Sequence, residues 1–376
     1  METIVNDLAI YSRYATARDA FLNLVARQPE VRISRYEHPE PGPDGKPLFV
    51  DTAWLGRKSA KSVLVLISGT HGVEGIAGSM IQQEWLARGE PSHLPDDVAV
   101  LLIHALNPWG FAWLRRPTHE NVDLNRNWLD FSALLPGNAA YGEIAKIVEP
   151  IRREDARMRR LAPRLVSYAL RHGRYGLALG QGLRRIRAAV SGGQYEHPNG
   201  LFFGGTTPAW SRGVLTRILV DQLADARQVA IIDFHTGLGR NGATEKMISA
   251  PQGSERTIRA DQWFGGGITP VGGASSSSAS IEGDLMRSVP ELIPHAEVSA
   301  VALEFGTKPS LQVLQALVAD NWLHAHGDPL GPEAPAIKRR IVEAFFDDSD
   351  RWREAVVAST FDTCRSVLKT LSVLVD

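Results

Sequence analysis

Short runs of apolar residues recur along the chain, and a polar or glycine-rich segment follows each of them. Three of these runs are Ser62–Ile67, Val98–Ile103 and Val229–Phe234. Runs that are almost free of polar residues are typical of strands buried on both faces of a sheet. After the first run, Gly78–Arg88 has apolar residues at helical spacing. Strands that alternate with helices predict an α/β fold with a mixed, mostly parallel central sheet flanked by helices.

The two ends of the chain add helices and a hairpin to this pattern. Residues 1–30 have the apolar spacing of a helix, and residues 31–60 are rich in proline and turn-forming residues. Within the latter, Leu48–Leu55 alternates as an edge strand would. Pro309–His326 predicts one helix and Ile337–Leu374 predicts one or two. These last helices pack either on the sheet or on a partner subunit, which leaves a homo-oligomer open.

The segment 133–200 differs in character from the rest of the predicted single domain, 1–376. Between Ile151 and Val190 there are eleven arginines against two acidic residues, in a helical pattern broken by proline and glycine. We interpret it as an arginine-rich helical insertion with a solvated basic face. The alternative is a roof over the site that attracts an anionic substrate. Nucleic-acid binding is disfavoured, because the arginines and the few aromatic residues among them form no recognisable nucleic-acid-binding motif.

Composition excludes several further classes of function. The 376 residues are 44% hydrophobic and 22% charged, which is ordinary for a soluble globular protein. The 41 basic and 42 acidic residues give a net charge of −1, so no overall charge favours nucleic acid or a membrane surface. No apolar run approaches the roughly 18 residues of a membrane span. The single Cys364 excludes an intramolecular disulfide, and no signal-peptide pattern follows Met1, so we expect a cytoplasmic protein.

Candidate metal ligands follow directly after the first buried strand. His71 and Glu74 stand three residues apart in the loop where that strand ends and a helix begins. At this spacing an imidazole nitrogen and a carboxylate can converge on one ion, and zinc accepts both donor types. A lone pair of this kind is a common chance occurrence, but open α/β sheets bind their ligands at the carboxyl ends of strands. Gly72 and Gly75 allow a sharp turn around the pair.

Two further polar residues stand at the ends of later apolar runs. His235 follows Val229–Phe234 and supplies a third candidate zinc ligand. Glu304 ends the run Val298–Leu303, where the alternative is a strand-edge residue that points to solvent. A buried carboxylate is costly unless it is paired or metal-bound, and a glutamate beside zinc is the usual general base for water. His197 is a weaker candidate ligand, because three ligands already leave the open position that catalysis requires.

These motifs resemble the zinc carboxypeptidase superfamily, including its deacylases of the aspartoacylase and succinylglutamate desuccinylase type. The resemblance covers about residues 45–310, and its most specific part is the string Asp123-Leu-Asn-Arg126. It implies the carboxypeptidase-like fold and one Zn²⁺ per chain, bound by His71, Glu74 and His235. It also implies that Glu304 activates the water.

The resemblance gives arginine and asparagine side chains the substrate-binding roles. Asn125 and Arg126 would bind a substrate carboxylate, and Arg116 or Arg115 would polarise the scissile carbonyl. The chemistry suits these roles, because a guanidinium matches a carboxylate in bidentate fashion and stabilises a developing oxyanion. The alternative for Arg115 and Arg116 is a solvated surface pair.

The chain also departs from the carboxypeptidase pattern. Those enzymes carry a tyrosine between the second histidine and the glutamate, whereas all seven tyrosines here lie at or before Tyr195. Tyr195 could take that place only by reaching in from the glycine-rich segment 192–206, where Gln194 and His197 are the other candidate substrate contacts. The segment Gly265–Ser278 has the composition of a lid or of an inert surface loop.

The sequence therefore predicts a zinc-dependent hydrolase of an amide bond in a carboxylate-bearing substrate, either a small peptide or an acylamino acid. Carboxypeptidase and deacylase activity remain open alternatives. A different class, a non-catalytic anion- or peptide-binding protein on the same fold, would use the arginines but would not need Glu304. A serine hydrolase is disfavoured because the chain has no Gly-x-Ser-x-Gly motif.

Overall fold

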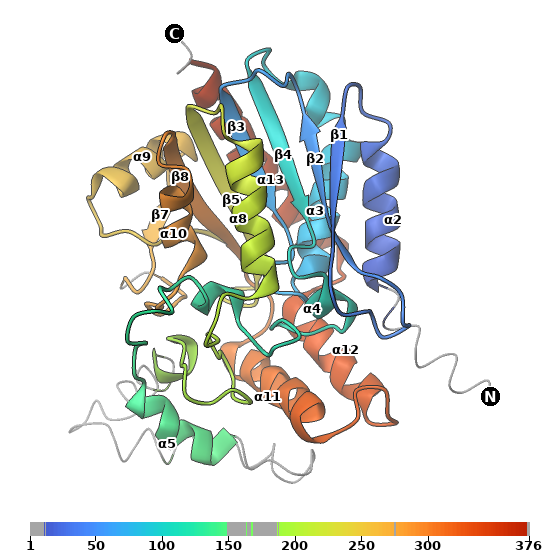
Figure 1. Cartoon of the computed structure of the whole chain (residues 1–376), viewed down its shortest axis with the longest axis vertical. Helices are drawn as coiled ribbons and strands as arrows, with labels where there is room; N and C mark the ends of the chain where they lie inside the picture. The colour runs from blue at the N-terminus through green and yellow to red at the C-terminus, as the bar shows by residue number, and fades with distance from the viewer. Residues whose placement is uncertain are drawn as a thin grey trace.

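A central sheet of eight strands lies between two layers of helices, and further helices lie beyond one end of the strands (Figure 1). This computed structural model describes residues 11, 13–148, 163, 167, 186, 188–273 and 276–373. In chain order the strands are β1 (Arg32–Glu37), β2 (Phe49–Leu55), β3 (Ser62–Ile67), β4 (Val98–His104), β5 (Gln228–Thr236), β6 (Thr244–Ile248), β7 (Ile268–Pro270) and β8 (Glu297–Phe305).

The strand order is β1-β2-β4-β3-β5-β8-β6-β7, with a parallel centre. Strands β4, β3, β5 and β8 run parallel, whereas β1 and β2 form an antiparallel hairpin and β6 runs antiparallel to β8. The mixed, mostly parallel sheet predicted from the apolar runs is therefore confirmed.

The helices surround this sheet. Those described are α2 (Arg13–Val25), α3 (Gly75–Ala87), α4 (Pro108–Ala112), α5 (Ala139–Val148), α8 (Trp210–Gln222), α9 (Glu255–Trp263), α10 (Leu285–Leu292), α11 (Ser310–His326), α12 (Ala334–Phe345) and α13 (Asp350–Val373), with short 3₁₀ turns η2 (Glu90–His93) and η3 (Leu124–Arg126). Among these residues, no helix is long and apolar enough to cross a membrane.

The alternation of side chains along each central strand divides the core into two parts. In β3, Leu64 and Leu66 pack with the buried residues of α3 and α13. Val63 and Val65 face the other way, into the core formed with α8 and α10. Every position of β3 is buried, because successive side chains point to opposite covered faces. This explains why the strand lacks the polar alternation of a half-exposed sheet.

Some expected boundaries differ from those observed. The helix expected at Gly78–Arg88 begins three residues earlier, at Gly75, directly after the candidate ligand Glu74. The C-terminal segment forms two helices, α12 and α13, and α13 lies against α3 and the sheet. Most of the arginine-rich segment 133–200 lies outside the described residues, so its interpretation as a helical insertion with a solvated basic face stays a prediction. The alternative of a roof over the site and the single-domain organisation also stay predictions.

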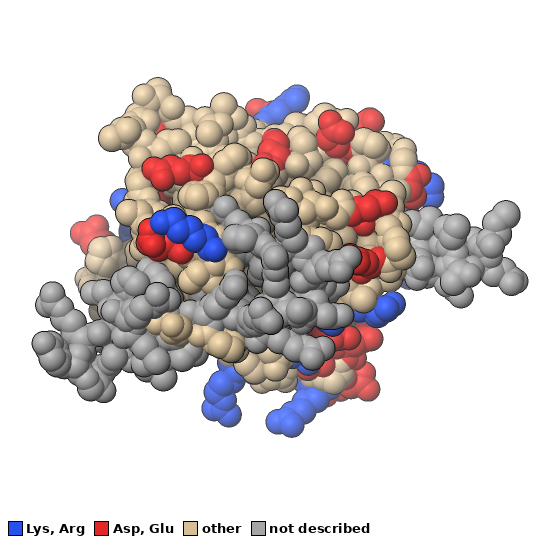
Figure 2. All heavy atoms as spheres, turned by 90° about the horizontal axis from the view of Figure 1, so that it is seen from below, with Lys and Arg blue, Asp and Glu red and all other residues tan. Residues whose placement is uncertain are grey.

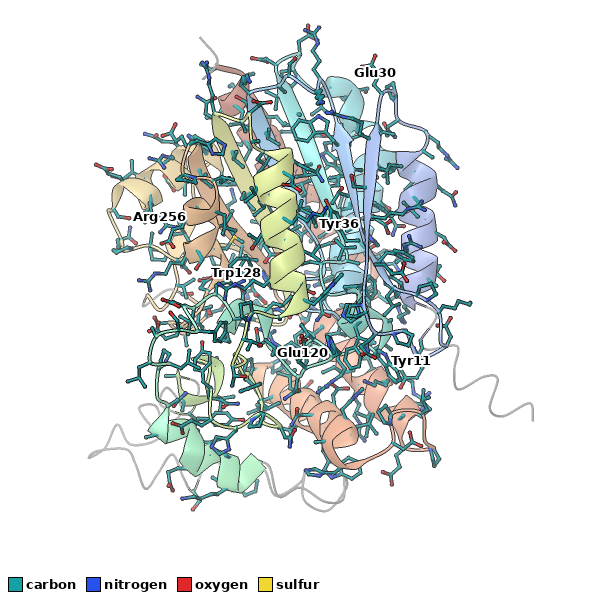
Figure 3. All side chains as sticks on the ribbon, viewed as in Figure 1. Tyr11, Glu30, Tyr36, Glu120, Trp128 and Arg256 are labelled. Atoms are coloured by element: carbon teal, nitrogen blue, oxygen red, sulfur yellow. The ribbon has the colours of Figure 1, made fainter. Side chains whose placement is uncertain are left out.

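Parallel neighbours place the candidate site at one end of the sheet. Strands β3, β5 and β8 are adjacent, and His235 of β5 is in register with Glu304 of β8. His71 follows the end of β3 at the same edge. In Figure 1 this is the lower end, towards α4, α11 and α12. Figure 3 places Glu120 near this end and Glu30 at the opposite one.

Candidate metal centre and substrate pocket

The loop between β3 and α3 is held by close packing against the segment that follows β4. A Cβ on Gly72 would lie 2.0 Å from the carbonyl carbon of Gly110, so only glycine fits there. The backbone N–H groups of Gly72 and Val73 donate to the carbonyl oxygens of Arg116 (3.1 Å) and Arg115 (2.8 Å). The position of the loop that carries the candidate ligands therefore depends on the backbone of this arginine pair.

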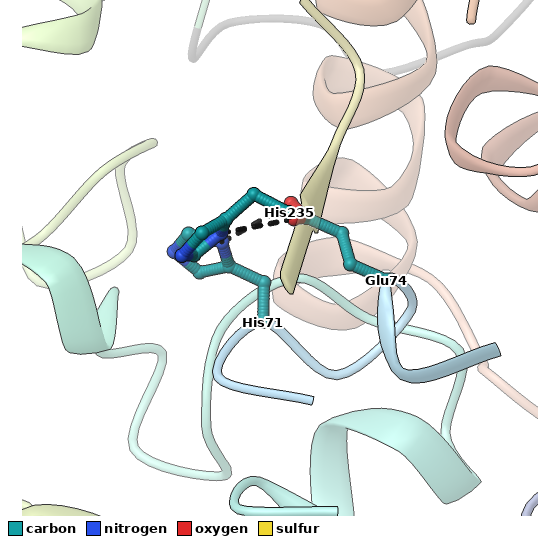
Figure 4. Close-up of side chains that lie close together, drawn as sticks. All are labelled: His71, Glu74 and His235. Carbon is teal, nitrogen blue, oxygen red and sulfur yellow. Dashed lines mark hydrogen bonds and ion pairs between the residues drawn. The ribbon is translucent and has the colours of Figure 1, made fainter. Parts of the chain in front are cut away.

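Three side chains converge at this edge of the sheet (Figure 4). The Nδ1 atom of His71 lies 3.1 Å from the Glu74 carboxylate and 3.2 Å from Nδ1 of His235, which is itself 3.2 Å from Glu74. Donors in a tetrahedral zinc shell, each about 2.05 Å from the ion, lie about 3.3 Å apart. All three side chains are buried. The donor types and their spacing thus fit a zinc ion and leave a fourth direction for another ligand.

A carboxylate lies behind each of the two histidines. Nε2 of His71 lies 2.9 Å from Asp123, and Nε2 of His235 lies 2.7 Å from Asp233. Asp233 also accepts a hydrogen bond from the Thr70 hydroxyl (2.7 Å). A carboxylate in this position favours the tautomer with the proton on Nε2, which would leave Nδ1 to bind a metal ion.

Charges within the cluster shift the protonation of its members. Burial alone would raise the pKa of Glu74, but His71 and Arg116 hold the pKa of that carboxyl well below its ordinary value. Burial also opposes the protonation of His235, yet Asp233 and Glu74 raise its pKa well above the usual range. Both shifts reflect unlike charges packed together in a buried site, which is an arrangement that a bound cation would reorganise.

Glu304 differs from Glu74 because the pKa of its carboxyl is raised, which favours the neutral form. The Glu304 side chain is buried near the end of β8, and its Oε1 accepts a hydrogen bond from the N–H of Leu238 (2.8 Å). Burial, followed by the nearby charge of Glu74, raises the pKa of Glu304 to about 8. The solvent-pointing alternative is excluded by this geometry, because the side chain lines the pocket.

This shift predicts a pH effect on the metal-free protein. The folded pKa of about 8 exceeds the value of 4.5 for a free glutamate, so protonation of Glu304 stabilises the folded state relative to its ionised form. This contribution to the free energy of unfolding is fully present below pH 4.5 and is lost as pH rises through 8. In urea titrations of metal-free protein, Glu304→Gln is therefore expected to gain free energy of unfolding relative to wild type across this window. Parallel pH curves for the two proteins would show that Glu304 is not buried as described.

The two candidate arginines have different surroundings. Arg116 donates to Glu74 (2.7 Å) and Asp123 (3.0 Å) and lines the pocket beside the three candidate ligands. Arg115 turns away: its guanidinium bonds Asp320 (3.2 Å) and Asn121 (2.9 Å). Neither is a solvated surface residue. The geometry brings Arg116 to the site and leaves Arg115 in a separate buried cluster.

Asn125 and Arg126 both line the pocket, at the turn η3. Oδ1 of Asn125 accepts from the N–H of Leu285 (3.4 Å), which leaves its amide N–H groups available to a ligand. The Arg126 guanidinium donates to the carbonyl oxygens of Ser191 and Asn125 (both 3.0 Å), an arrangement that fixes its plane. Tyr195 instead donates its hydroxyl to the carbonyl oxygen of Arg126 (2.6 Å). It supports the turn from behind and is not among the described pocket-lining residues.

The pocket extends from the cluster and opens to solvent. Its polar lining includes Thr236, Ser249 and Asp284 besides the residues above, and its apolar lining includes Met247, Val271, Ile281, Met286 and Leu317. Ser278 also lines it, so the segment expected to be a lid or an inert loop contributes to the wall. Among the described lining residues, neither Gln194 nor His197 occurs. Seen from this end, the described surface carries both acidic and basic side chains (Figure 2).

A model of the protein family described as "Protein of unknown function (DUF2817)" matches residues 11–359. The chain belongs to this family. None of the curated proteins compared with it matches in sequence. Among solved structures, bovine thrombin-activatable fibrinolysis inhibitor, in complex with a tick carboxypeptidase inhibitor, is 10% identical with a TM-score of 0.50, over 96% of this chain and 97% of that one. This likeness shows that the DUF2817 chain has the carboxypeptidase-like fold expected from its motifs.

Two further solved structures are similar at lower scores. Carboxypeptidase A from Helicoverpa armigera is 11% identical, with a TM-score of 0.40, over 86% of this chain and 71% of that chain. Succinylglutamate desuccinylase from Chromobacterium violaceum is 13% identical, with a TM-score of 0.36, over 82% and 74%.

Asp233 and Phe202 are among the residues of the DUF2817 chain's site that were not found by sequence reasoning. Asp233 stands two positions before His235 on β5, and residues two apart on a strand share a face, so this signal was present. Phe202 lines the pocket, and its backbone has φ of +53°. The centre of its ring lies 5.2 Å from the guanidinium carbon of Arg116 and 5.5 Å from that of Arg126. No sequence pattern indicates that contact, because it joins segments brought together only by folding.

Proposed function

We propose that this protein is a zinc-dependent hydrolase of an amide bond in a small substrate that bears a free carboxylate. One observation carries the proposal. The two histidines and Glu74 face one point with zinc-like spacing, and Glu304, Arg116 and Arg126 line the pocket that adjoins it. A peptide with a free C-terminus and an N-acylated amino acid both present the required carboxylate near an amide bond, so both belong to the proposed class.

The cluster would hold one zinc ion through His71 Nδ1, Glu74 and His235 Nδ1. When bound there, zinc acts as a Lewis acid and lowers the pKa of a water molecule. Its positive charge would also lower the pKa of Glu304 from about 8, since a nearby cation favours the carboxylate. Glu304 would then take a proton from the water and pass it to the leaving amine.

The arginines divide the remaining tasks between them. Arg116, held by Glu74 and Asp123, points a fixed guanidinium at the space beside the cluster, where it would stabilise the oxygen of the scissile carbonyl as charge develops. Arg126 and the amide of Asn125 would bind the substrate carboxylate and so orient the amide bond. A protein that only binds anions would need the arginines but would gain nothing from a buried, protonatable Glu304.

The proposal is tested by metal content and hydrolysis in the wild-type protein. We expect about one zinc per chain by elemental analysis, and hydrolysis of some members of a panel of N-acylamino acids and dipeptides with a free carboxylate. The matched controls are the same compounds with that carboxylate converted to an amide, which should be poor substrates. A protein that takes up no zinc when it is supplied, or that binds zinc but hydrolyses nothing in the panel, would contradict the proposal.

A further inference from the structure

A lysine on α12 is completely buried outside the pocket. Nζ of Lys338 lies 2.6 Å from the Asp320 carboxylate on α11 and donates to the carbonyl oxygen of Trp113 (2.7 Å), and its distance to the carbonyl oxygen of Leu114 is 3.5 Å. It also lies 2.8 Å from Nε2 of His324. The ammonium group therefore joins α11 and α12 to the turn that precedes the arginine pair.

The buried cluster around Asp320 has more positive than negative charge, and the carbonyl oxygens of the 113–114 turn help to stabilise the excess. Asp320 faces two cations, because its other oxygen accepts from Arg115 (3.2 Å). Burial, and then the charge of Lys338, hold the pKa of His324 well below its ordinary value, so His324 is neutral and accepts a hydrogen bond. One carboxylate cannot neutralise two buried cations, so the excess positive charge is stabilised by the carbonyl oxygens that point at Lys338.

The backbone of the turn is strained in a way that these bonds maintain. Leu114 has φ of +51°, in the left-handed region that residues other than glycine rarely adopt. A conformation of this kind is unfavourable and persists only where its surroundings enforce it. The next two carbonyl oxygens, of Arg115 and Arg116, accept from the N–H groups of Val73 and Gly72 in the candidate metal loop.

A continuous set of bonds thus runs from α12 to the metal loop. We propose that Lys338 is a positioning residue for the metal centre: by holding the carbonyl oxygens of the 113–114 turn, it sets the position of the Arg116 guanidinium and of the loop that carries His71 and Glu74. The inference rests on the proposed zinc site. The buried ammonium group of Lys338 would thus influence zinc affinity although it contacts neither the metal nor the substrate.

The test compares zinc affinity with stability in two variants of α12. Lys338→Met keeps the length of the side chain and removes its charge and its donors. Ile337→Ala is the matched control, because Ile337 is equally buried and packs among Ala319, Leu323 and Ala334, so its loss destabilises α12 without removing a bond to the turn. Zinc dissociation constants are measured by competition with a chromophoric chelator, at a temperature where circular dichroism shows each protein folded.

We expect Lys338→Met to weaken zinc binding by about 3- to 10-fold, less than the roughly 10- to 100-fold that loss of a direct hydrogen-bond partner of a ligand costs, and Ile337→Ala to leave it within about twofold. Visible spectra of the cobalt-substituted proteins should change in the first variant alone, because they report ligand geometry. Lys338→Gln, which retains one donor, should be intermediate, and it serves as the test variant if Lys338→Met does not fold.

Two other outcomes would contradict the proposals, and they can be told apart. Wild-type zinc affinity in Lys338→Met, or equal weakening in Lys338→Met and Ile337→Ala, would overturn the positioning role while leaving the proposed function intact. A wild-type protein that binds no zinc would overturn both.

Discussion

Replacing Glu304 by glutamine is expected to lower kcat about a thousandfold while the protein retains one zinc per chain. Glutamine has nearly the same shape but cannot accept the proton of the attacking water, and general acid–base catalysis typically contributes about 10²–10⁴ in rate. The Glu304 carboxylate lines the pocket without being one of the three candidate ligands, so zinc affinity should be nearly unchanged. Steady-state kinetics on a substrate identified by the panel, with elemental analysis of the same sample, measure both quantities.

The same strand offers a matched control for this variant. Glu297 begins β8 at the end opposite the pocket and pairs with Arg259 on the surface (2.8 Å). Glu297→Gln should therefore keep wild-type kcat and KM. If Glu304→Gln retained more than about a tenth of wild-type kcat, the proton transfer would have to be assigned to another group.

Replacing His71 by alanine is expected to remove zinc and activity together. Loss of an outer hydrogen-bond partner of a metal ligand costs about 10- to 100-fold in affinity, so loss of the ligand itself should exceed about a hundredfold. Fewer than about 0.1 zinc per chain should then survive dialysis against a weak chelator, and added zinc at high concentration should restore little activity because the coordination shell is incomplete.

The control for this variant is an exposed histidine far from the pocket. His93 lies in η2, on the loop before β4, and His93→Ala should bind zinc as the wild type does. Full zinc content in His71→Ala, with the protein folded, would mean that zinc binds elsewhere. The convergence of the two histidines and Glu74 would then have to be explained by their hydrogen bonds alone.

The arginine pair shows where sequence reasoning reaches its limit. Both residues stand in the same motif, and the resemblance to carboxypeptidases allows either one to act on the carbonyl. Adjacent residues outside regular structure have no fixed relation between their directions, and the choice depends on Asp320, which is 205 positions from Arg115. Tyr195 shows the same limit: its position in the glycine-rich segment 192–206 suggested a substrate contact, but folding places its hydroxyl on the backbone of Arg126.

The amino-acid order by itself determined the sheet, its parallel centre and the strand ends that carry His71, Glu74, His235 and Glu304. These features follow from local pattern, because a buried strand needs an apolar run and parallel strands bring their carboxyl ends to one edge. Only the tertiary structure decided which arginine faces the pocket, that Asp233 lies behind His235, and that Lys338 holds the turn before Arg116. Those relations depend on contacts between distant segments of a close-packed interior, where burial and neighbouring charges decide the direction of each polar side chain.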